Sequence, residues 1–208
     1  GVTTTYYDPL IGADIGKLFK PNTRAVFVEA PGSQSFEMQD IPAIAKVAHA
    51  KGAFVLMDNT WATPLYFSAF ELILDLSIQA GTKYIGGHSD IMFGCVSANA
   101  ATLPALKTTV HTMGLCVGPD DIYLALRGLR TLGVRLAQHH RAGLEMARWL
   151  ESRPEVARVL HPALESHPGH AIWKRDFTGA CGLFGVVLRE GISDRALCAM
   201  IDGLELYG

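Results

Sequence analysis

The sequence predicts an α/β protein built on a mostly parallel sheet with flanking helices, followed by the start of a smaller α+β unit. In the first hundred residues short apolar runs alternate with helical patterns, which is typical of a parallel sheet covered by helices. Each run ends in polar or glycine residues, and the carboxyl ends of strands in such sheets are where ligands bind. After residue 119 the pattern changes to a long amphipathic helix and then to shorter elements.

The first half is expected to contain four strands and one helix. We predict strands over residues 24–29, 53–58, 74–80 and 90–98. A helix is predicted over residues 41–51, because Asp40 can cap its first turn, Pro42 suits its start and Gly52 ends it.

The second half is expected to be dominated by one long helix over residues 120–152. Apolar side chains recur there at steps of three and four residues, with arginines interspersed. After it, we predict strands over residues 156–160 and 183–188, and a helix over residues 193–201 capped by Ser193.

The change of pattern predicts a domain boundary near residues 128–133. Residues 1–130 then form part of a large ligand-binding domain and residues 131–208 part of a small C-terminal domain. The chain starts at Gly1 and stops inside an apolar run, residues 204–208, that indicates a strand. We therefore expect it to be an internal piece of a longer polypeptide.

The composition argues against several classes of function. The 208 residues carry 18 basic and 20 acidic side chains, and a net charge of -2 gives no attraction to nucleic acid or to an anionic membrane. The apolar stretches are too short to span a membrane. The four cysteines lie far apart without a CxxC pair, which favours free thiols in a reducing compartment and hence a cytoplasmic protein.

Lys83 is the residue with the clearest chemical potential. It lies between the apolar run at residues 74–80 and a glycine-rich turn at residues 84–87. Most lysines are solvated surface residues, but a lysine held in an apolar pocket becomes a usable amine and general base. The pattern by itself leaves these two interpretations about equally open.

Asp58 ends a predicted strand after four apolar residues, where a carboxylate needs a partner. It can accept backbone hydrogen bonds, or it can pair with a bound cation such as a protonated pyridine. A phosphoryl-accepting DxD pair is less favoured because position 60 is Thr60. An acid and a lysine at successive strand ends are what a pyridoxal-phosphate (PLP) enzyme needs: Lys83 forms a Schiff base with the cofactor, and Asp58 keeps the pyridine nitrogen protonated.

Thr82 precedes this lysine and offers a hydroxyl beside glycines, which suits a phosphate group. A threonine satisfied within its own turn is an equally open interpretation. The consecutive residues His88, Ser89 and Asp90 cannot converge as a catalytic triad, so we predict a turn with local side-chain bonds.

The remaining histidines and arginines are predicted to have structural roles. No metal site is expected, because the histidines lack a metal-binding spacing. We interpret them as surface or packing residues: His139, His140, His161, His167 and His170. The arginines of the long helix, Arg135 among them, are predicted to form a solvated or interface face.

Several segments together resemble the Cys/Met-metabolism PLP-dependent enzymes. They are residues 4–14 (TTYYDPLIGAD), 57–62 (MDNTWA), 79–84 (QAGTKY), 87–90 (GHSD), 127–135 (RGLRTLGVR) and 173–179 (WKRDFTG). The similarity runs over essentially the whole chain. It implies a fold-type I PLP-dependent transferase, like aspartate aminotransferase, with residues 1–130 in its PLP-binding domain. It also implies Lys83 as the Schiff-base lysine, Asp58 as the partner of the pyridine nitrogen and Thr82 as a phosphate contact.

The first and last of these segments resemble the carbon–sulfur β-lyases of the family, as does Ser33 after Glu29-Ala30-Pro31-Gly32. The resemblance therefore implies α,β-elimination of L-cystathionine to homocysteine, pyruvate and ammonia, by a homotetramer built as a dimer of dimers. Ala80 stands where family members often carry a serine for the phosphate.

Three alternatives stay open. The chain resembles γ-synthases and γ-lyases of the same family as well. It can be a catalytically incomplete cofactor-binding fragment, because the phosphate-gripping loop, the ring-stacking tyrosine and the carboxylate-binding arginine of the family are expected outside this chain. An α/β domain unrelated to PLP is disfavoured by the joint match of the motifs.

Overall fold

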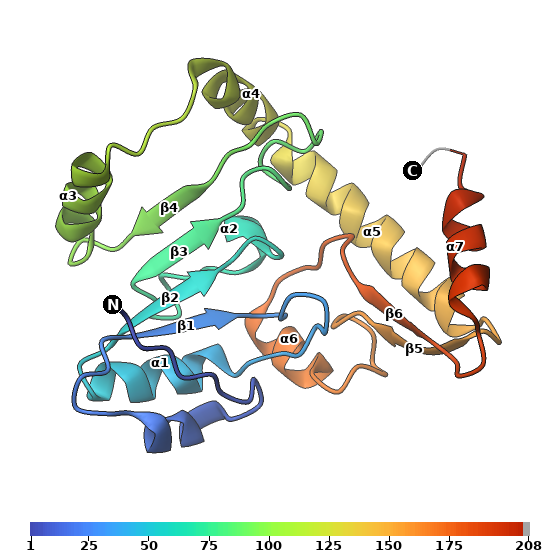
Figure 1. Ribbon diagram of the computed structural model, residues 1–208, viewed down its shortest axis with the longest axis horizontal. Coiled ribbons are helices and arrows are strands. Elements are labelled where there is room, and N and C mark those ends of the chain that lie inside the picture. Colours follow the sequence, from blue (N-terminus) through green and yellow to red (C-terminus); the bar gives the residue numbers. More distant parts are fainter. Residues whose placement is uncertain (206–208) are drawn as a thin grey trace.

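Two β-sheets joined by a long helix make up the part of the chain that the computed structural model describes, residues 1–205 (Figure 1). One sheet has the strand order β1-β2-β3-β4, and the other pairs β5 with β6. The elements in chain order are η1 (Gly12–Leu18), β1 (Ala25–Glu29), α1 (Ile41–Ala50), β2 (Phe54–Asp58), α2 (Thr63–Tyr66), β3 (Leu76–Gln79), β4 (Cys95–Ala98), α3 (Leu103–Met113), α4 (Pro119–Leu129), α5 (Leu132–Glu151), β5 (Val156–Leu160), α6 (His170–Asp176), β6 (Gly185–Leu188) and α7 (Asp194–Asp202).

The larger sheet confirms the predicted α/β architecture. Strands β1, β2 and β3 are parallel, and β4 is antiparallel to β3. The helix predicted between the first two strands is α1, and the Asp40 side chain caps it by accepting a hydrogen bond from the Ala43 amide at 3.2 Å. Strand β4 begins at Cys95, later than predicted, because the preceding residues fold back so that Phe93 contacts Thr82.

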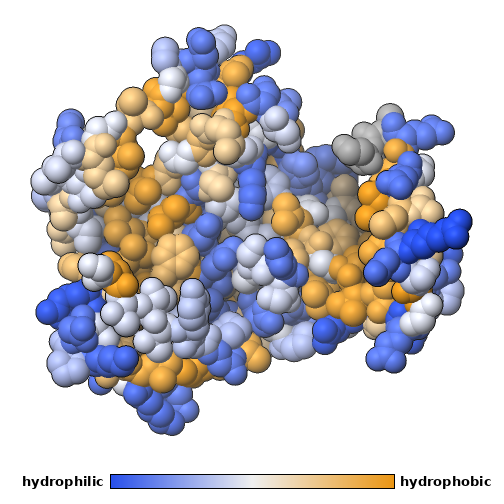
Figure 2. Space-filling view, viewed as in Figure 1, coloured by the Kyte–Doolittle hydropathy of each residue, from blue (hydrophilic) through white to orange (hydrophobic). Residues whose placement is uncertain are grey.

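Only one face of this sheet is fully covered. Alternate side chains of β1 and β2, including Val28 and Met57, are buried beneath α1 in the main core. The opposite face is apolar as well, but Phe27, Phe54 and Val96 are 54%, 51% and 43% exposed. Figure 2 shows apolar residues gathered over this sheet. Parallel sheets are ordinarily covered on both faces, so this face is suited to bury against further protein.

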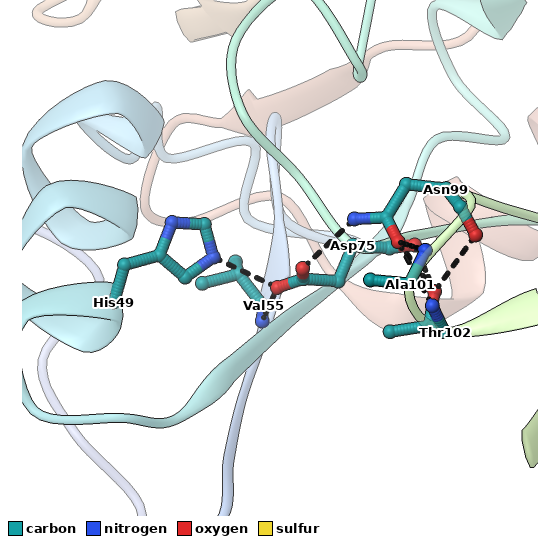
Figure 3. A network of polar contacts seen from close by, with 6 residues as sticks. All are labelled: His49, Val55, Asp75, Asn99, Ala101 and Thr102. Atoms are coloured by element: carbon teal, nitrogen blue, oxygen red, sulfur yellow. Dashed lines mark hydrogen bonds and ion pairs between the residues drawn. The ribbon is translucent and has the colours of Figure 1, made fainter.

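A buried polar network ties the amino-terminal ends of the strands together (Figure 3). The Asp75 carboxylate accepts hydrogen bonds from the Val55 amide at 2.7 Å and the Asn99 side-chain amide at 3.0 Å, and it contacts His49 at 2.8 Å. The Thr102 hydroxyl donates to the Asp75 carbonyl oxygen at 3.0 Å. The network lies at the edge of the sheet opposite the candidate site, so it supports the sheet without taking part in the site.

The prediction of a single helix over residues 120–152 is wrong. The helix breaks at Arg130 and Thr131 into α4 and α5. The cause is tertiary: Gly128 lies so close to the turn after β3 that an added Cβ would be 2.2 Å from the Ile85 carbonyl oxygen. The Thr131 hydroxyl also donates to the Gly128 carbonyl oxygen at 3.1 Å, which takes that oxygen out of a regular helix.

The elements predicted after the long helix are confirmed with small shifts. Strand β5 has its predicted bounds, and Ser193 caps α7 through the Ala196 amide. Strand β6 begins at Gly185 rather than 183, because the Leu183 carbonyl accepts a hydrogen bond from the Trp61 indole at 2.8 Å. The strand predicted over residues 204–208 is absent at Leu204 and Glu205, and its last three residues lie outside the described part.

Four short elements were not predicted, η1, α2, α3 and α6. Helix α6 contains the WKRD segment and binds the start of α1, since the Arg175 guanidinium contacts the Asp40 carboxylate at 2.8 and 3.2 Å. The division of the chain at residue 130 stays a prediction. Within residues 1–205, no helix is long and apolar enough to cross a membrane.

Candidate active site

The carboxyl ends of β1, β2 and β3 meet at one edge of the sheet. Asp58 is the last residue of β2, and it is paired in register with Glu29 at the end of β1 and with Ile78 in β3. Lys83 follows four residues after the end of β3. The parallel register therefore brings the predicted acid and the predicted lysine to the same edge, where α/β sheets bind ligands.

Asp58 is half-buried and has one carboxylate oxygen engaged. Its Oδ1 accepts a hydrogen bond from the Thr60 amide at 2.9 Å. Glu29 beside it is half-buried too: burial and the charge of Asp58 raise the Glu29 pKa, whereas Lys83 acts to lower it. These three groups are thus close enough to influence one another. The sequence analysis gave Glu29 no role, although its position at a strand end was a usable signal.

Lys83 is exposed at the rim of a cavity of about 690 Å³. The cavity is lined by Thr82, Lys83, Tyr84, Gly87, Ser89, Asp90, Ile91, Met92, His139, Gly182 and Leu183. The neighbouring Tyr84 and Ile85 are buried, so the backbone of the turn is anchored while the lysine side chain projects. The described residues therefore form only part of the expected enclosed apolar pocket. The cavity has polar as well as apolar lining residues, and it is open to solvent.

The Thr82 side chain is already satisfied within its own surroundings. Its hydroxyl accepts a hydrogen bond from the Phe93 amide at 3.1 Å and donates to the Phe93 carbonyl oxygen at 3.2 Å. This is the structural interpretation that the sequence had left open. A phosphate contact by Thr82 stays a prediction, and it requires the hydroxyl to exchange its Phe93 partner for the phosphate.

Two cavity-lining residues, Tyr84 and His139, and the buried Cys181 next to Tyr84 were given no role in the site from the sequence. The Tyr84 ring packs edge-on against the His139 ring, with centroids 5.4 Å apart. Burial raises the pKa of Tyr84 and raises that of Cys181 to about 11, whereas burial and the nearby Arg135 lower the pKa of His139. Tyr84, His139 and Cys181 lie 42 to 97 positions apart in the sequence. No local pattern links them.

Two of the histidines interpreted as surface or packing residues, His161 and His167, are buried. His161 is fully buried, and its Nδ1 accepts a hydrogen bond from the Ala163 amide at 3.2 Å. Burial lowers the pKa of His161 to about 4, so the ring is neutral near neutral pH. His88 bonds locally to the Gly86 carbonyl oxygen at 3.0 Å. In the described part of the chain, no group of three or more acidic, histidine or cysteine side chains is arranged to hold a metal ion.

The residues at this edge fit PLP. Among residues 1–205, Lys83 Nζ and Asp58 Oδ2 have no hydrogen-bond or ion-pair partner. An unengaged amine can bind the cofactor aldehyde, and a half-buried carboxylate oxygen suits the protonated pyridine nitrogen. This fold and this pair of residues are the ones expected of a fold-type I PLP-dependent enzyme.

The chain belongs to the family described as Cys/Met metabolism PLP-dependent enzyme, whose model matches residues 1–207. A putative cystathionine β-lyase from Rhizobium johnstonii is 54% identical over the whole of this chain, which covers 53% of that protein. The cystathionine β-lyase MetC of Escherichia coli is 48% identical, with the same two coverages. The chain thus spans about half the length of the curated relatives that it matches.

Solved structures agree with this assignment. A cystathionine γ-lyase from Lactobacillus plantarum in complex with L-serine matches with a TM-score of 0.87 and 26% identity, over 93% of this chain and 50% of that one. A cystathionine γ-synthase from Xanthomonas oryzae pv. oryzae matches with a TM-score of 0.84 and 32% identity, over 89% of this chain and 48% of that one. The fold of this chain is therefore shared by proteins named as a γ-lyase and a γ-synthase.

Proposed function

We propose that this chain supplies the centre of the active site of a PLP-dependent carbon–sulfur β-lyase. The observation that carries the proposal is the placement of Lys83 and Asp58 at the ends of neighbouring parallel strands, each with an unengaged functional atom. The proposed reaction converts L-cystathionine and one water molecule into homocysteine, pyruvate and ammonia.

Lys83 has two proposed tasks. Its Nζ would hold the cofactor, and the same nitrogen, when free, would accept the proton from the substrate α-carbon. A projecting lysine on an anchored turn suits both tasks, because the side chain can swing while its backbone stays in place. Departure of the thiol from the β-carbon then completes the elimination.

Asp58 has the proposed task of holding a proton on the pyridine nitrogen through its Oδ2. When bound, PLP supplies the electron sink that makes the α-proton acidic. Glu29 lies beside Asp58, and burial together with the charge of Asp58 raises the pKa of Glu29.

The β-lyase assignment is favoured over its rivals by sequence identity. Relatives named cystathionine β-lyase are 44–54% identical to this chain, whereas a tobacco cystathionine γ-synthase is 38% identical. A γ-synthase or γ-lyase remains the second candidate, since the matching solved structures carry those names. A catalytically incomplete fragment is the third, because the phosphate-gripping loop and the carboxylate-binding arginine that the family resemblance implies are expected outside this chain.

The assembly and location are proposals as well. We propose a homotetramer, a dimer of dimers whose subunits share active sites, with a small amino acid as the only substrate class and no nucleic acid or membrane. The uncovered apolar face with Phe27 and Phe54 supports burial against further protein. The cytoplasm is the proposed location, because Cys95, Cys116 and Cys181 are free thiols, as is Cys198.

Borohydride trapping tests the cofactor assignment. Protein incubated with PLP is reduced with sodium borohydride, and the label is located by peptide mapping. We expect one label, on Lys83, which Lys83→Ala abolishes together with the elimination activity. Lys46→Ala is the matched control, because Lys46 is an exposed lysine on α1 and should not alter labelling. Near-normal turnover by Lys83→Ala would refute the assignment.

Product analysis then separates β- from γ-elimination. Pyruvate is the oxo acid expected from L-cystathionine after β-elimination, and 2-oxobutyrate is expected after γ-elimination. Formation of 2-oxobutyrate in place of pyruvate would refute the β-lyase assignment and support the second candidate, a γ-synthase or γ-lyase. A label on Lys83 without either product would favour the incomplete fragment.

A further inference from the structure

We infer that Arg135 is a positioning residue that holds in place the turn carrying Lys83. The inference rests on the proposed function of that lysine and adds a residue to it. Arg135 is on α5, more than fifty positions after the lysine, and the sequence analysis had placed it on a solvated or interface face. That interpretation is wrong, because its guanidinium is partly buried against the lysine turn.

The turn after β3 is closed by its own backbone hydrogen bonds. The Lys83 amide donates to the Ala80 carbonyl at 3.0 Å, and the Gly87 amide donates to the Lys83 carbonyl at 2.8 Å. The beginning of the turn is also tied to the sheet, because the Thr60 hydroxyl accepts from the Ala80 amide at 2.8 Å. The end of the turn has no such tie from the sheet and depends on another element.

Arg135 provides that tie. Its Nη2 donates to the Ile85 carbonyl oxygen at 3.3 Å and to the Gly128 carbonyl oxygen at 2.8 Å, while its Nε donates to the Thr131 hydroxyl at 3.0 Å. One side chain thus joins the turn to both sides of the break between α4 and α5. The planar guanidinium is suited to this, because its donors point in fixed and different directions.

The packing leaves room for nothing larger at the two contact points. A Cβ added at Gly87 would be 2.3 Å from Arg135 Nη1, and Gly87 has a φ of +82°. A Cβ added at Gly128 would be 2.2 Å from the Ile85 carbonyl oxygen. The guanidinium therefore lies directly against the backbone of the turn, and the two glycines are what permit this approach.

The electrostatics indicate a positioning role rather than an ordinary ion pair. Burial lowers the pKa of Arg135, and within residues 1–205 no carboxylate pairs with it. Its Nη1 is buried without a hydrogen-bond partner. Burying the Arg135 guanidinium without a carboxylate partner lowers the stability of the fold. A gain in stability alone therefore does not explain why Arg135 bonds to backbone carbonyls. Fixing the peptide groups that follow Lys83 explains these bonds.

The inference is tested with the variant Arg135→Gln, made in the native protein. The matched control is Arg141→Gln. Arg141 is an exposed residue of the same helix, and among residues 1–205 its side chain bonds only to Gln138. Three quantities are measured: the rate at which PLP and borohydride label Lys83, kcat against KM, and the acetylation of Lys83 by acetic anhydride relative to Lys46 in cofactor-free protein. Retention of the fold is checked by circular dichroism.

We expect Arg135→Gln to slow labelling and lower kcat by about 10- to 100-fold with KM changed little, because misplacing a reactive group by about 1 Å costs that order of rate. The acetylation ratio of Lys83 to Lys46 should change as well. Arg135→Lys should restore part of the loss, methylguanidinium should restore labelling in Arg135→Ala, and Arg141→Gln should behave as wild type. A folded Arg135→Gln protein with wild-type labelling, kcat and acetylation ratio would overturn the inference.

Two further outcomes are decisive. If Arg135→Gln does not fold, Thr131→Val is used instead. It removes the acceptor of Arg135 Nε, together with the bond of the same hydroxyl to the Gly128 carbonyl oxygen, and should give an intermediate loss. Wild-type behaviour of that variant would count against the positioning role. If wild-type protein acquires no label on Lys83, the proposed function fails. In that case the ratio of Lys83 to Lys46 acetylation, compared between cofactor-free wild type and Arg135→Gln, still tests whether Arg135 positions Lys83.

Discussion

Replacing Asp75 with alanine is expected to lower the free energy of unfolding by about 3–5 kcal/mol, because the carboxylate is the centre of the network at the amino-terminal ends of the strands. The variant leaves the Val55 amide buried without its acceptor and removes the contacts with Asn99 and His49 (Figure 3). An unsatisfied buried amide costs about 1–3 kcal/mol, and a hydrogen bond to a charged group contributes about 1.5–3 kcal/mol. His49 is partly exposed and can rebind water, so its contact adds least.

The conservative variant Asp75→Asn is expected to cost less, about 1–2 kcal/mol. Its amide oxygen can still accept from the Val55 amide, whereas the contacts with Asn99 and His49 lose the carboxylate charge. In a chain of this size each kcal/mol lowers Tm by about 2–4 °C, so Asp75→Ala should lower Tm by roughly 10 °C. Neither change should alter borohydride labelling of Lys83, because the network and the site lie at opposite edges of the sheet.

The effect of Asp75 should depend on pH. Burial by itself raises the pKa of Asp75, but hydrogen bonds from the Val55 amide, His49 and Asn99 outweigh it and leave the pKa lowered. The unfolded chain then binds the proton more tightly, so acid favours unfolding. The stabilisation is complete above the unfolded pKa of about 3.9 and is lost as the pH falls through the folded pKa.

Urea unfolding of wild-type, Asp75→Asn and Asp75→Ala proteins, followed by circular dichroism between neutral pH and about pH 3, measures both effects. The stability gap between wild type and Asp75→Asn should narrow toward the acid end. A loss below about 1 kcal/mol for Asp75→Ala at neutral pH would refute the reasoning, since it lies beneath the cost of one unsatisfied amide. A gap that stays constant with pH would refute the charge assignment.

Gly128→Ala should destabilise the protein by about 1–3 kcal/mol and weaken PLP labelling, because its Cβ would meet the Ile85 carbonyl oxygen at 2.2 Å. In Gly133→Ala, the control in denaturant unfolding, the new Cβ has only one atom within 4 Å, so a similar loss there would contradict this reasoning. Asp58→Asn should still bind PLP but slow exchange of the substrate α-proton. It should also lower the pKa of Glu29, which an NMR titration would detect; an unchanged Glu29 pKa would contradict the proximity of the two carboxyls.

Much of the fold was predictable because its signals are local. Local signals include the alternation of buried and exposed residues in β1 and β2, the Asp40 cap, and Gly52 just after the end of α1, and each acts within a few residues. Helix α3 was missed because its neighbouring threonines weaken the helical signal and none of its residues is buried in the described structure. An apolar periodicity in the sequence reflects a buried helix face, and α3 has no buried face in the described structure.

The sequence by itself determined which residues are proposed for the site and their order: an acid ending one strand and a lysine just after the next, in segments that resemble one family. Parallel strands place their carboxyl ends at one edge, so chain order was enough to bring Asp58 and Lys83 together. The tertiary structure alone decided the break at Arg130, the satisfied hydroxyl of Thr82 and the contact of Arg135 with the lysine turn. Each of these features depends on a contact with an atom many residues away in the sequence. The spacing of apolar residues continues unchanged across the helix break, so the spacing could not reveal it.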